Sequence, residues 1–249
     1  ALHKGHLALV NKAKEDNDFV VVSVFVNPTQ FNNSSDFDNY PNQLELDITL
    51  LEQAGVDCVF LPNVDELYPY QSVLKFDFGY LEHVMEGEFR PGHFNGVATV
   101  VSKFFNIITP HKAYFGQKDI QQVAVIKMLV LGLSFQLDIV VVPTLREMCG
   151  LAMSSRNQRL TDEEKVKARA IYQALDRSRD ELLSGKSFVV VQQDGIRSLE
   201  SQGFKVEYLE LTKSSTLEKV TGLSTGEYAI CLAAYLGDVR LIDNLLFIV

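Results

Sequence analysis

The 249-residue chain lacks several features that would assign it to a specialised class of protein. It has no excess of positive charge: its formal net charge is −9, which argues against non-specific binding to nucleic acid or to a membrane surface. It contains no apolar run near the roughly 18–20 residues that a membrane span needs. It also has no internal repeat and no low-complexity tract. With 47% hydrophobic residues, it has instead enough apolar side chain for a folded core.

Cysteine is scarce, and the three cysteines, Cys58, Cys149 and Cys231, lie far apart. Cys58 and Cys231 fall in strand-like apolar runs, where a buried thiol behaves as a small hydrophobic side chain. We expect all three to be unpaired in a reducing cytoplasm. The five histidines form no zinc-binding pattern with any cysteine.

The first six residues carry the strongest chemical pattern of the chain. His3 and His6 flank Lys4 and Gly5, and an amphipathic helical pattern follows at once. A helix that begins here directs its free N–H groups and a partial positive charge at the turn, which suits a phosphate. Gly5 allows close approach of a ligand, and the imidazoles can donate hydrogen bonds to phosphoryl oxygens. Alone, the pattern is equally typical of two surface histidines at a helix start.

This turn comes without a strand before it. A phosphate-holding turn in an α/β protein normally follows a strand. We therefore expect the parent protein to have a short β-branched or apolar strand directly before Ala1.

Strand and helix patterns alternate up to about residue 145. The apolar run 19–26 is typical of a strand covered on both faces, and it ends in polar residues that include Asn27, Gln30 and the loop 33–35. Such alternation predicts βαβ units and hence a Rossmann-like parallel sheet. The other elements expected in this part are strands over 57–61, 113–115 and 136–142 and helices over 44–54, 96–108 and 120–131.

The pattern changes after residue 157. Thr161 and Glu164 form a capping box that predicts a long helix over 162–183. A second helical stretch and strand-like segments follow, typical of a small α+β domain. We expect a Rossmann-like domain at 1–150 and a smaller α+β domain at 151–249, with the boundary near 147–158. The strand-like segments span 206–211, 228–236 and 239–242.

Two further stretches have the chemistry of a phosphate site. In Gly116-Gln117-Lys118-Asp119, at an expected strand end, Lys118 offers a point charge for phosphate and Asp119 can accept hydrogen bonds from ribose. The alternative is that Asp119 only caps the next helix.

The second of these stretches is Ser154-Ser155-Arg156, which places two hydroxyls and a guanidinium in the interdomain loop. Such a loop can act as a mobile clamp for a triphosphate, or it can be a plain linker. Together with the two histidines, we expect these stretches to form one anion-holding cleft.

Six longer motifs extend the pattern over the whole chain. Together they resemble the pantothenate synthetase (pantoate–β-alanine ligase) family, within the nucleotidyltransferase superfamily that has an H-x-G-H motif. The motifs occupy residues 1–6, 24–31, 90–94, 115–122, 150–157 and 236–244.

The resemblance implies an AMP-forming ligase. Pantoate would attack the α-phosphate of Mg²⁺-bound ATP to give pantoyl adenylate and pyrophosphate, and β-alanine would then displace AMP to give pantothenate. It also implies cytoplasmic, small-molecule biosynthesis by a homodimer, with no nucleic acid or membrane as partner.

Site residues follow from the same resemblance. His6 would be the catalytic donor to the developing phosphate charge, with His3 and Lys118 beside it. Gln30 and Gln122 would hold pantoate, and Asn27 would line the same pocket. Arg90 and His93 either attract a substrate carboxylate or form a rigid turn. The residues expected at ATP are Ala1, Leu2, His3, Gly5, His6, Gly116, Gln117, Lys118, Asp119, Leu145 (through its backbone), Met153, Ser154, Ser155 and Arg156.

The chain departs from the family pattern at Gln117, where glutamate is usual, and this puts any role of that carboxylate in doubt. Two rival functions stay open. One is an adenylyltransferase that keeps AMP on its product, which the amide-rich motifs at 27–31 and 119–122 and the second domain disfavour. The other is a nucleotide-binding regulatory module without turnover. It is disfavoured by the intact residues His3, His6, Lys118 and Arg156.

Overall fold

The structure is a computed structural model that describes residues 1–30, 43–70 and 72–249. The expected polar loop at 33–35 therefore lies outside the described residues. Within the described part, the chain divides into two compact units. The first comprises residues 1–116 and 121–143, and the second comprises residues 117–120 and 144–249. The predicted boundary near 147–158 stays a prediction.

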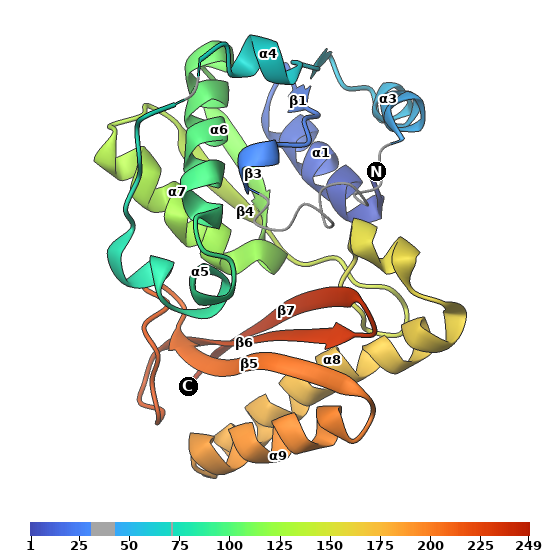
Figure 1. The fold of residues 1–249 in the computed structure, drawn as a ribbon, viewed down its shortest axis with the longest axis vertical. Helices are drawn as coiled ribbons and strands as arrows, with labels where there is room; N and C mark the ends of the chain where they lie inside the picture. The colour runs from blue at the N-terminus through green and yellow to red at the C-terminus, as the bar shows by residue number, and fades with distance from the viewer. Residues whose placement is uncertain (31–42, 71) are drawn as a thin grey trace. The chain divides into compact units, whose positions relative to one another are not determined.

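The first unit is built from short parallel strands and helices (Figure 1). Its described strands form two parallel pairs, β1 with β2 and β3 with β4. This confirms the α/β class and the parallel pairing that the alternating pattern predicts. The elements are α1 (Lys4–Asp16), β1 (Val21–Ser23), η1 (Pro28–Gln30), α3 (Leu44–Gln53), β2 (Cys58–Phe60), α4 (Val64–Leu67), η2 (Gly79–Glu82), α5 (Met85–Phe89), α6 (His93–Ile108), β3 (Lys112–Gly116), α7 (Ile120–Gly132) and β4 (Asp138–Val142).

Helix α6 supplies much of the core of this unit. Its apolar face buries Phe94, Val97 and Val101. The ring of Phe104 meets Phe25 and Phe60 edge-on, with centroids 6.3 and 5.9 Å away, and this places the helix against the strand pair β1–β2. Helix α6 thus packs on one side against the end of β1, where polar residues begin, and contributes its other apolar residues to the interior of the unit.

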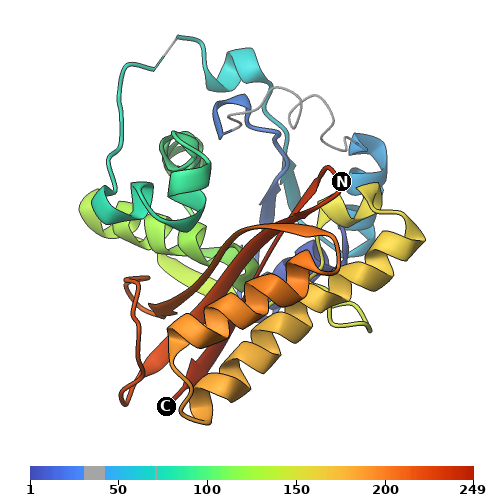
Figure 2. The same ribbon diagram turned by 60° about the horizontal axis from the view of Figure 1, so that its bottom comes forward.

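The second unit is an antiparallel sheet covered by two helices. Its strands β5 (Phe204–Lys213), β6 (Glu227–Leu236) and β7 (Val239–Ile248) pair in chain order. Figure 2 shows helices α8 (Asp162–Leu183) and α9 (Phe188–Glu200) lying side by side across this sheet. A short segment, η3 (Gln117–Asp119), also belongs to this unit, as does η4 (Ser155–Arg159).

The interior of the second unit is formed by the helix faces and the central strand. Residues 228–234 of β6 are all buried. Leu175 of α8 and Leu209 and Leu211 of β5 are fully excluded from solvent. The capping box of Thr161 and Glu164 starts α8 as predicted. The small α+β architecture expected for this part of the chain is therefore confirmed.

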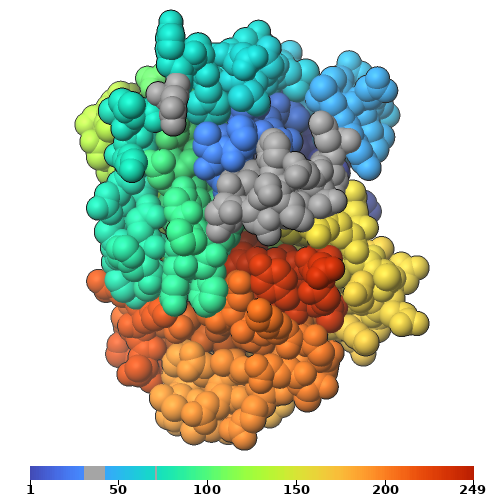
Figure 3. Space-filling model, in the orientation of Figure 1, coloured from blue at the N-terminus to red at the C-terminus, as the bar shows by residue number. Residues whose placement is uncertain are grey.

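The turn between β6 and β7 brings one end of the sheet to the surface. Gly237 and Asp238 are exposed there. In Figure 3, the red residues of this end reach the surface beside the yellow residues of η4 and the start of α8. Arg159 of η4 donates to the carbonyl of Asp238 at 3.5 Å. The residues that follow Ser154-Ser155-Arg156 are thus packed against the sheet.

Several sequence-based expectations differ from the structure. The run 19–26 forms a strand only at Val21–Ser23, and Phe19 is 64% exposed, so it is not covered on both faces. Its partner strand β2 is followed closely by Pro62. Because proline has no backbone N–H to donate, the hydrogen-bonded pairing of the two strands cannot continue through this residue. Cys58 is exposed rather than buried, whereas Cys231 is buried, and none of the three cysteines forms a disulfide.

Two further element boundaries differ from the expected ones by three residues or more. Helix α6 begins at His93, three residues earlier than the expected start at Gly96, because the left-handed turn at Gly92 ends the preceding segment. Strand β7 extends to Ile248, beyond the expected end at Ile242. The expected strand ended too early because Asp243 and Asn244 are polar. Although both are buried, they interrupt the apolar pattern by which a strand is predicted.

Candidate active site

The two histidines at the chain start cap helix α1 reciprocally. His3 is the N-cap residue, and its Nδ1 accepts from the N–H of Gly5 at 3.1 Å. The Nδ1 of His6 accepts from the N–H of His3 at 3.2 Å. The ring centroids lie 3.9 Å apart, and the ring planes are tilted by 35° to one another. The H-x-G-H pattern is therefore a capping box in which imidazoles replace the usual hydroxyl and carboxylate.

This capping fixes the tautomer of both rings. Because each Nδ1 accepts a backbone N–H, the proton of each neutral ring lies on Nε2. Both Nε2 atoms are then hydrogen-bond donors, as the stabilisation of phosphoryl charge requires. The sequence predicted these histidines, and the backbone contacts that orient them were not predicted.

A buried carboxylate holds the residues before the helix. Asp47 of α3 is 3% exposed, and its Oδ1 accepts from the N–H of Leu2 at 2.6 Å. Ala1 and Leu2, both expected at ATP, are partly buried. Asp47 was not predicted from the sequence, because an acidic residue in the first turn of a helix is ordinarily explained by the helix dipole.

Asn27 is the centre of an amide cluster after β1. It is 2% exposed, and its Nδ2 donates to the carbonyl of Gly96 at 3.1 Å. Its Oδ1 accepts from the hydroxyls of Tyr68 and Thr29 at 2.8 and 3.0 Å. Gln30 lies within reach, with Nδ2 of Asn27 3.5 Å from its Oε1. The structure therefore gives Asn27 a clear role in fixing the 27–30 segment.

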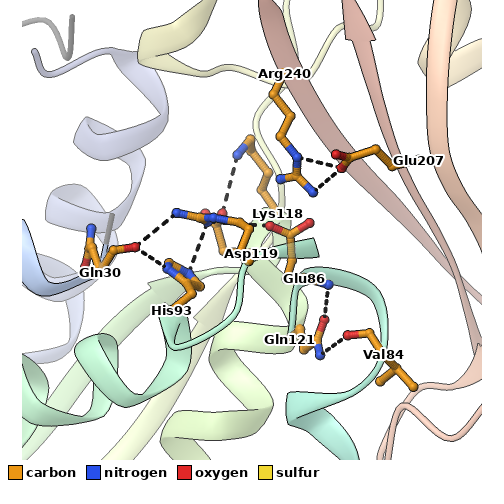
Figure 4. A network of polar contacts seen from close by, with 10 residues as sticks. Gln30, Val84, Glu86, His93, Lys118, Asp119, Gln121, Glu207 and Arg240 are labelled. Atoms are coloured by element: carbon orange, nitrogen blue, oxygen red, sulfur yellow. Dashed lines mark hydrogen bonds and ion pairs between the residues drawn. The ribbon is translucent and has the colours of Figure 1, made fainter. Parts of the chain in front are cut away.

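Arg90 and His93 converge on the backbone of Gln30. His93, which is 6% exposed, has its Nδ1 2.9 Å from the Gln30 carbonyl oxygen, and Nη2 of Arg90 donates to the same oxygen at 3.4 Å. Nη1 of Arg90 lies 3.1 Å from Nε2 of His93 and 3.5 Å from Oε2 of Glu86. Figure 4 shows Gln30 and His93 facing one another.

The bonding around His93 places its ring proton opposite to that of His3 and His6. The Gln30 carbonyl can only accept a hydrogen bond from Nδ1, and the Arg90 guanidinium can only donate one to Nε2. The ring proton of His93 therefore lies on Nδ1. Arg90-Pro91-Gly92 forms the turn and His93 begins the helix. Two interpretations of this motif were open, a carboxylate attractor and a rigid turn. The structure shows a turn whose charged group, the Arg90 guanidinium, is bonded within the protein.

The neighbouring glutamines at the start of α7 differ in environment. Gln121 is 2% exposed and donates from Nε2 to the carbonyls of Leu81 and Val84 at 2.8 and 3.0 Å. Its Oε1 accepts from the N–H of Glu86 at 2.9 Å, and Figure 4 shows this contact and the one with Val84. Gln122 is only partly buried. Successive helical residues point about 100° apart, so Gln121 fixes the helix while Gln122 faces elsewhere.

Lys118 and Asp119 follow β3 in the segment η3. The Nζ of Lys118 lies 3.5 Å from Oδ1 of Asp119, and their side chains are 16% and 46% exposed. A β-carbon at Gly116 would meet no atom within 4 Å, so packing does not require glycine there. The side chain of Gln117 donates from Nε2 to Oδ1 of Asn244 at 3.2 Å.

The segment Met153–Arg156 leads into η4. The N–H of Met153 donates to the carbonyl of Leu145 at 3.0 Å, and Leu145 is 40% exposed. Ser154 caps η4, its Oγ accepting from the N–H of Arg156 at 3.3 Å. Ser155 is 5% exposed, so this hydroxyl is buried in a short helix rather than displayed in an open linker.

Comparisons with known proteins decide the family. A family model described as pantoate-beta-alanine ligase matches residues 1–246. The chain belongs to the pantoate–beta-alanine ligase family. The pantothenate synthetase of Cytophaga hutchinsonii is 49% identical over all of this chain and 89% of the relative, and that of Fervidobacterium nodosum is 44% identical over 98% of this chain and 88% of the relative.

Solved structures of the same family share the fold. The pantothenate synthetase of Thermus thermophilus superposes with a TM-score of 0.92 at 43% identity, covering 98% of this chain and 89% of that one. A Francisella tularensis pantoate-beta-alanine ligase, solved in complex with beta-gamma ATP and beta-alanine, gives a TM-score of 0.83 at 40% identity, covering 98% and 85%. The ligase is thus an α/β enzyme that joins pantoate to β-alanine, as the motifs predicted.

No helix in the described ranges of this ligase is both long and apolar enough to cross a membrane.

Proposed function

We propose that this ligase works through an acyl adenylate. A carboxylate oxygen of pantoate attacks the α-phosphorus of ATP, and the bond from that phosphorus to pyrophosphate breaks. The amine of β-alanine then attacks the acyl carbon, AMP leaves with the electron pair of the acyl–oxygen bond, and the amine loses a proton. Activation is needed because a free carboxylate has no good leaving group, whereas the mixed anhydride of a carboxylic acid and AMP has one.

The reciprocal capping of α1 by His3 and His6 carries this proposal. Both Nδ1 atoms are engaged by the backbone, so both Nε2 atoms carry the donor hydrogen. In the proposed mechanism, His6 donates to the charge that grows on the phosphate groups as pyrophosphate leaves, and His3 supports it. The N-terminus of α1 adds its partial positive charge. This arrangement is set before any substrate binds.

The remaining residues have proposed binding roles. Lys118 supplies a fixed cation to the phosphates and Asp119 accepts from the ribose, while the backbone of Leu145 holds adenine. The side chains of Ser154 and Arg156 and the backbone of Ser155 hold the triphosphate. Gln30 and Gln122 hold pantoate, and Gln30 reaches β-alanine as well. The partners are thus three small molecules: pantoate, β-alanine and ATP.

Arg90 and His93 are proposed to act on pantoate through Gln30. Both side chains contact the Gln30 carbonyl oxygen, and Glu86 neutralises the guanidinium. They therefore determine where the Gln30 backbone lies. Asn27 fixes the same segment from the other side through the carbonyl of Gly96.

Magnesium is proposed to bind together with ATP. Within the described parts of the chain, no three His, Cys, Asp or Glu side chains gather as a metal site. Phosphate oxygens and water would hold Mg²⁺ beside the nucleotide, and the ion would there neutralise phosphate charge.

We also propose that the ligase is a cytoplasmic homodimer, as its family resemblance implies. Sedimentation velocity at micromolar concentration tests the oligomeric state.

A product assay tests the adenylate route. We expect AMP and pyrophosphate to form from ATP only when pantoate is present, and pantothenate to form when β-alanine is added. ADP and phosphate as products would reject the route. An AMP group retained on the final product would indicate an adenylyltransferase, and binding of ATP without turnover would indicate a regulatory module.

A further inference from the structure

Strand β7 carries two buried polar residues that the proposed mechanism does not use. Asp243 is 3% exposed and Asn244 is 1% exposed. They are the last two residues of the motif at 236–244. Burying a carboxylate and an amide is unfavourable unless both are fully bonded, so their partners show what they are for.

Asn244 holds the backbone of the Lys118 segment. Its Nδ2 donates to the carbonyls of Gln117 and Lys118 at 3.0 and 2.9 Å. Its Oδ1 accepts from Nε2 of Gln117 at 3.2 Å. A rotated amide would set its oxygen against two carbonyl oxygens, so only one orientation satisfies every group. Asn244 thereby fixes the peptide planes on both sides of the Lys118 α-carbon.

Asp243 holds the segment that precedes Met153. Its Oδ2 and Oδ1 accept hydrogen bonds from Nη1 and Nη2 of Arg146 at 2.5 and 3.0 Å, which makes a bidentate ion pair. Burial raises the pKa of the Asp243 carboxyl, and the guanidinium of Arg146 opposes that rise. Arg146 also donates to the carbonyls of Gly150 and Asn244 at 3.1 and 3.2 Å.

The chain around Arg146 forms a closed hairpin. Arg146 bridges Ala152 in an antiparallel pair, and its guanidinium lies 4.1 Å from the ring centroid of Tyr172. The N–H of Met153 returns to the carbonyl of Leu145. The proposed adenine contact and the start of the Ser154 segment are therefore set by one guanidinium.

We infer that Asp243 and Asn244 are positioning residues for ATP, because two consecutive residues of one strand hold both proposed ATP-binding segments of the second unit. Asn244 sets the backbone that carries Lys118, and Asp243 sets the hairpin that leads to Ser154 through Arg146. The N–H of Asn244 donates to Oδ1 of Asp243 at 2.8 Å, which joins the two contacts. This inference rests on the proposed function of those segments.

Asn244→Asp is the direct test. It keeps the shape of the side chain but replaces the two donor hydrogens by an acceptor that faces two carbonyl oxygens. We expect the Kd for the nonhydrolysable β,γ-analogue of ATP, measured by calorimetry, to rise at least about tenfold, with the Kd for pantoate changed less than about twofold. Asn106→Asp is the matched control, since Asn106 is exposed on α6 and donates to the carbonyl of Ser102 within its own helix.

A second pair of variants separates positioning from stability. Asp243→Leu alone leaves the Arg146 guanidinium without its carboxylate and should lower the unfolding midpoint. The double variant Arg146→Met with Asp243→Leu removes both charges and should recover most of the lost stability. We expect the weakened analogue binding to persist in the double variant. Analogue binding at the wild-type level in folded Asn244→Asp, or in the restored double variant, would overturn the inference.

The wild-type protein separates this inference from the proposed function. If it binds the analogue and forms pantothenate while the variants also bind normally, only the positioning inference fails. If the wild-type protein binds no analogue, the proposed function and the inference fail together.

Discussion

Gly96 of helix α6 lies directly against the backbone of Thr29: a β-carbon built on Gly96 would lie 2.3 Å from the Thr29 carbonyl oxygen. Its own carbonyl accepts from Nδ2 of Asn27 at 3.1 Å. The helix and the 27–30 segment are thus in van der Waals contact through their main chains. No other residue type fits there without a shift of one backbone.

Gly96→Ala should therefore move the 27–30 segment and weaken pantoate binding. Overpacking of this kind lowers the free energy of unfolding by about 1–3 kcal/mol, although alanine favours a helix. We expect the KM for pantoate to rise more than the KM for ATP. Gly132→Ala on α7 is the control, because a β-carbon there meets nothing within 4 Å. Equal behaviour of the two variants in urea unfolding and in kinetics would contradict this account.

His6→Ala should reduce turnover by about 100-fold or more with little loss of folded protein. The variant loses the Nε2 donor and one backbone contact, that from the N–H of His3. Loss of a cap costs about 1 kcal/mol, which circular dichroism and a thermal midpoint will register separately from kcat. His111→Ala is the control, since His111 is exposed at the edge of β3. Normal turnover by folded His6→Ala would show that the assignment is wrong.

At the chain start, candidate residues could be selected from the sequence, whereas their geometry could not. His3, Gly5 and His6 were identified from residue type and helical pattern, both of which are local. The rings cap the helix through Nδ1 because of their side-chain rotamers. Asp47 holds Leu2 through a contact between residues 45 positions apart. Neither contact has a local signature.

The same division holds for the strands. Helix α8 was predicted with its true ends, because the capping box at Thr161 marks its start and its pattern runs unbroken. The run 19–26 was predicted too long, since its length is set by the three residues of β2 with which it pairs. The end of β7 was missed because Asp243 and Asn244 break its apolar pattern. Their bonds to Arg146 and to the 117–118 backbone explain why they are tolerated there.

The contacts of Arg90 predict a selective effect on pantoate. Removing its side chain alone would leave the Glu86 carboxylate, 9% exposed, without its cation and would destabilise the fold. The double variant Arg90→Met with Glu86→Gln avoids this. We expect its KM for pantoate to rise about tenfold with the KM for ATP within about twofold, because the Gln30 carbonyl loses a donor.

A double-mutant cycle with Gln30→Ala shows whether the effect passes through Gln30. Losses that do not add indicate coupling, whereas additive losses would show that Arg90 acts independently. Arg197→Met serves as the control for loss of a guanidinium, since Arg197 is 71% exposed on α9.

Tyr228 on β6 should ionise at unusually low pH. The ammonium of Lys213 donates to its oxygen at 2.9 Å and, with the hydrogen bonds from Ser224, lowers the pKa of Tyr228 from 10 to about 8. The chain has nine tyrosines and no tryptophan, so tyrosinate absorbance is free of indole absorbance. A difference titration of wild type against Tyr228→Phe should show one phenol ionising near pH 8, and its absence below pH 9.5 would refute the assignment.

The same group gives stability a defined pH dependence. The folded-state pKa lies below the unfolded value, so between about pH 8 and 10 the unfolded chain binds more protons at this site than the folded chain does. Tyr228 therefore adds stability as the pH rises through this window, and that contribution is fully present above about pH 10 and is lost as the pH falls through about 8. Urea unfolding should show the advantage of wild type over Tyr228→Phe growing across the window. A constant difference would mean that Lys213 and Ser224 do not stabilise the phenolate.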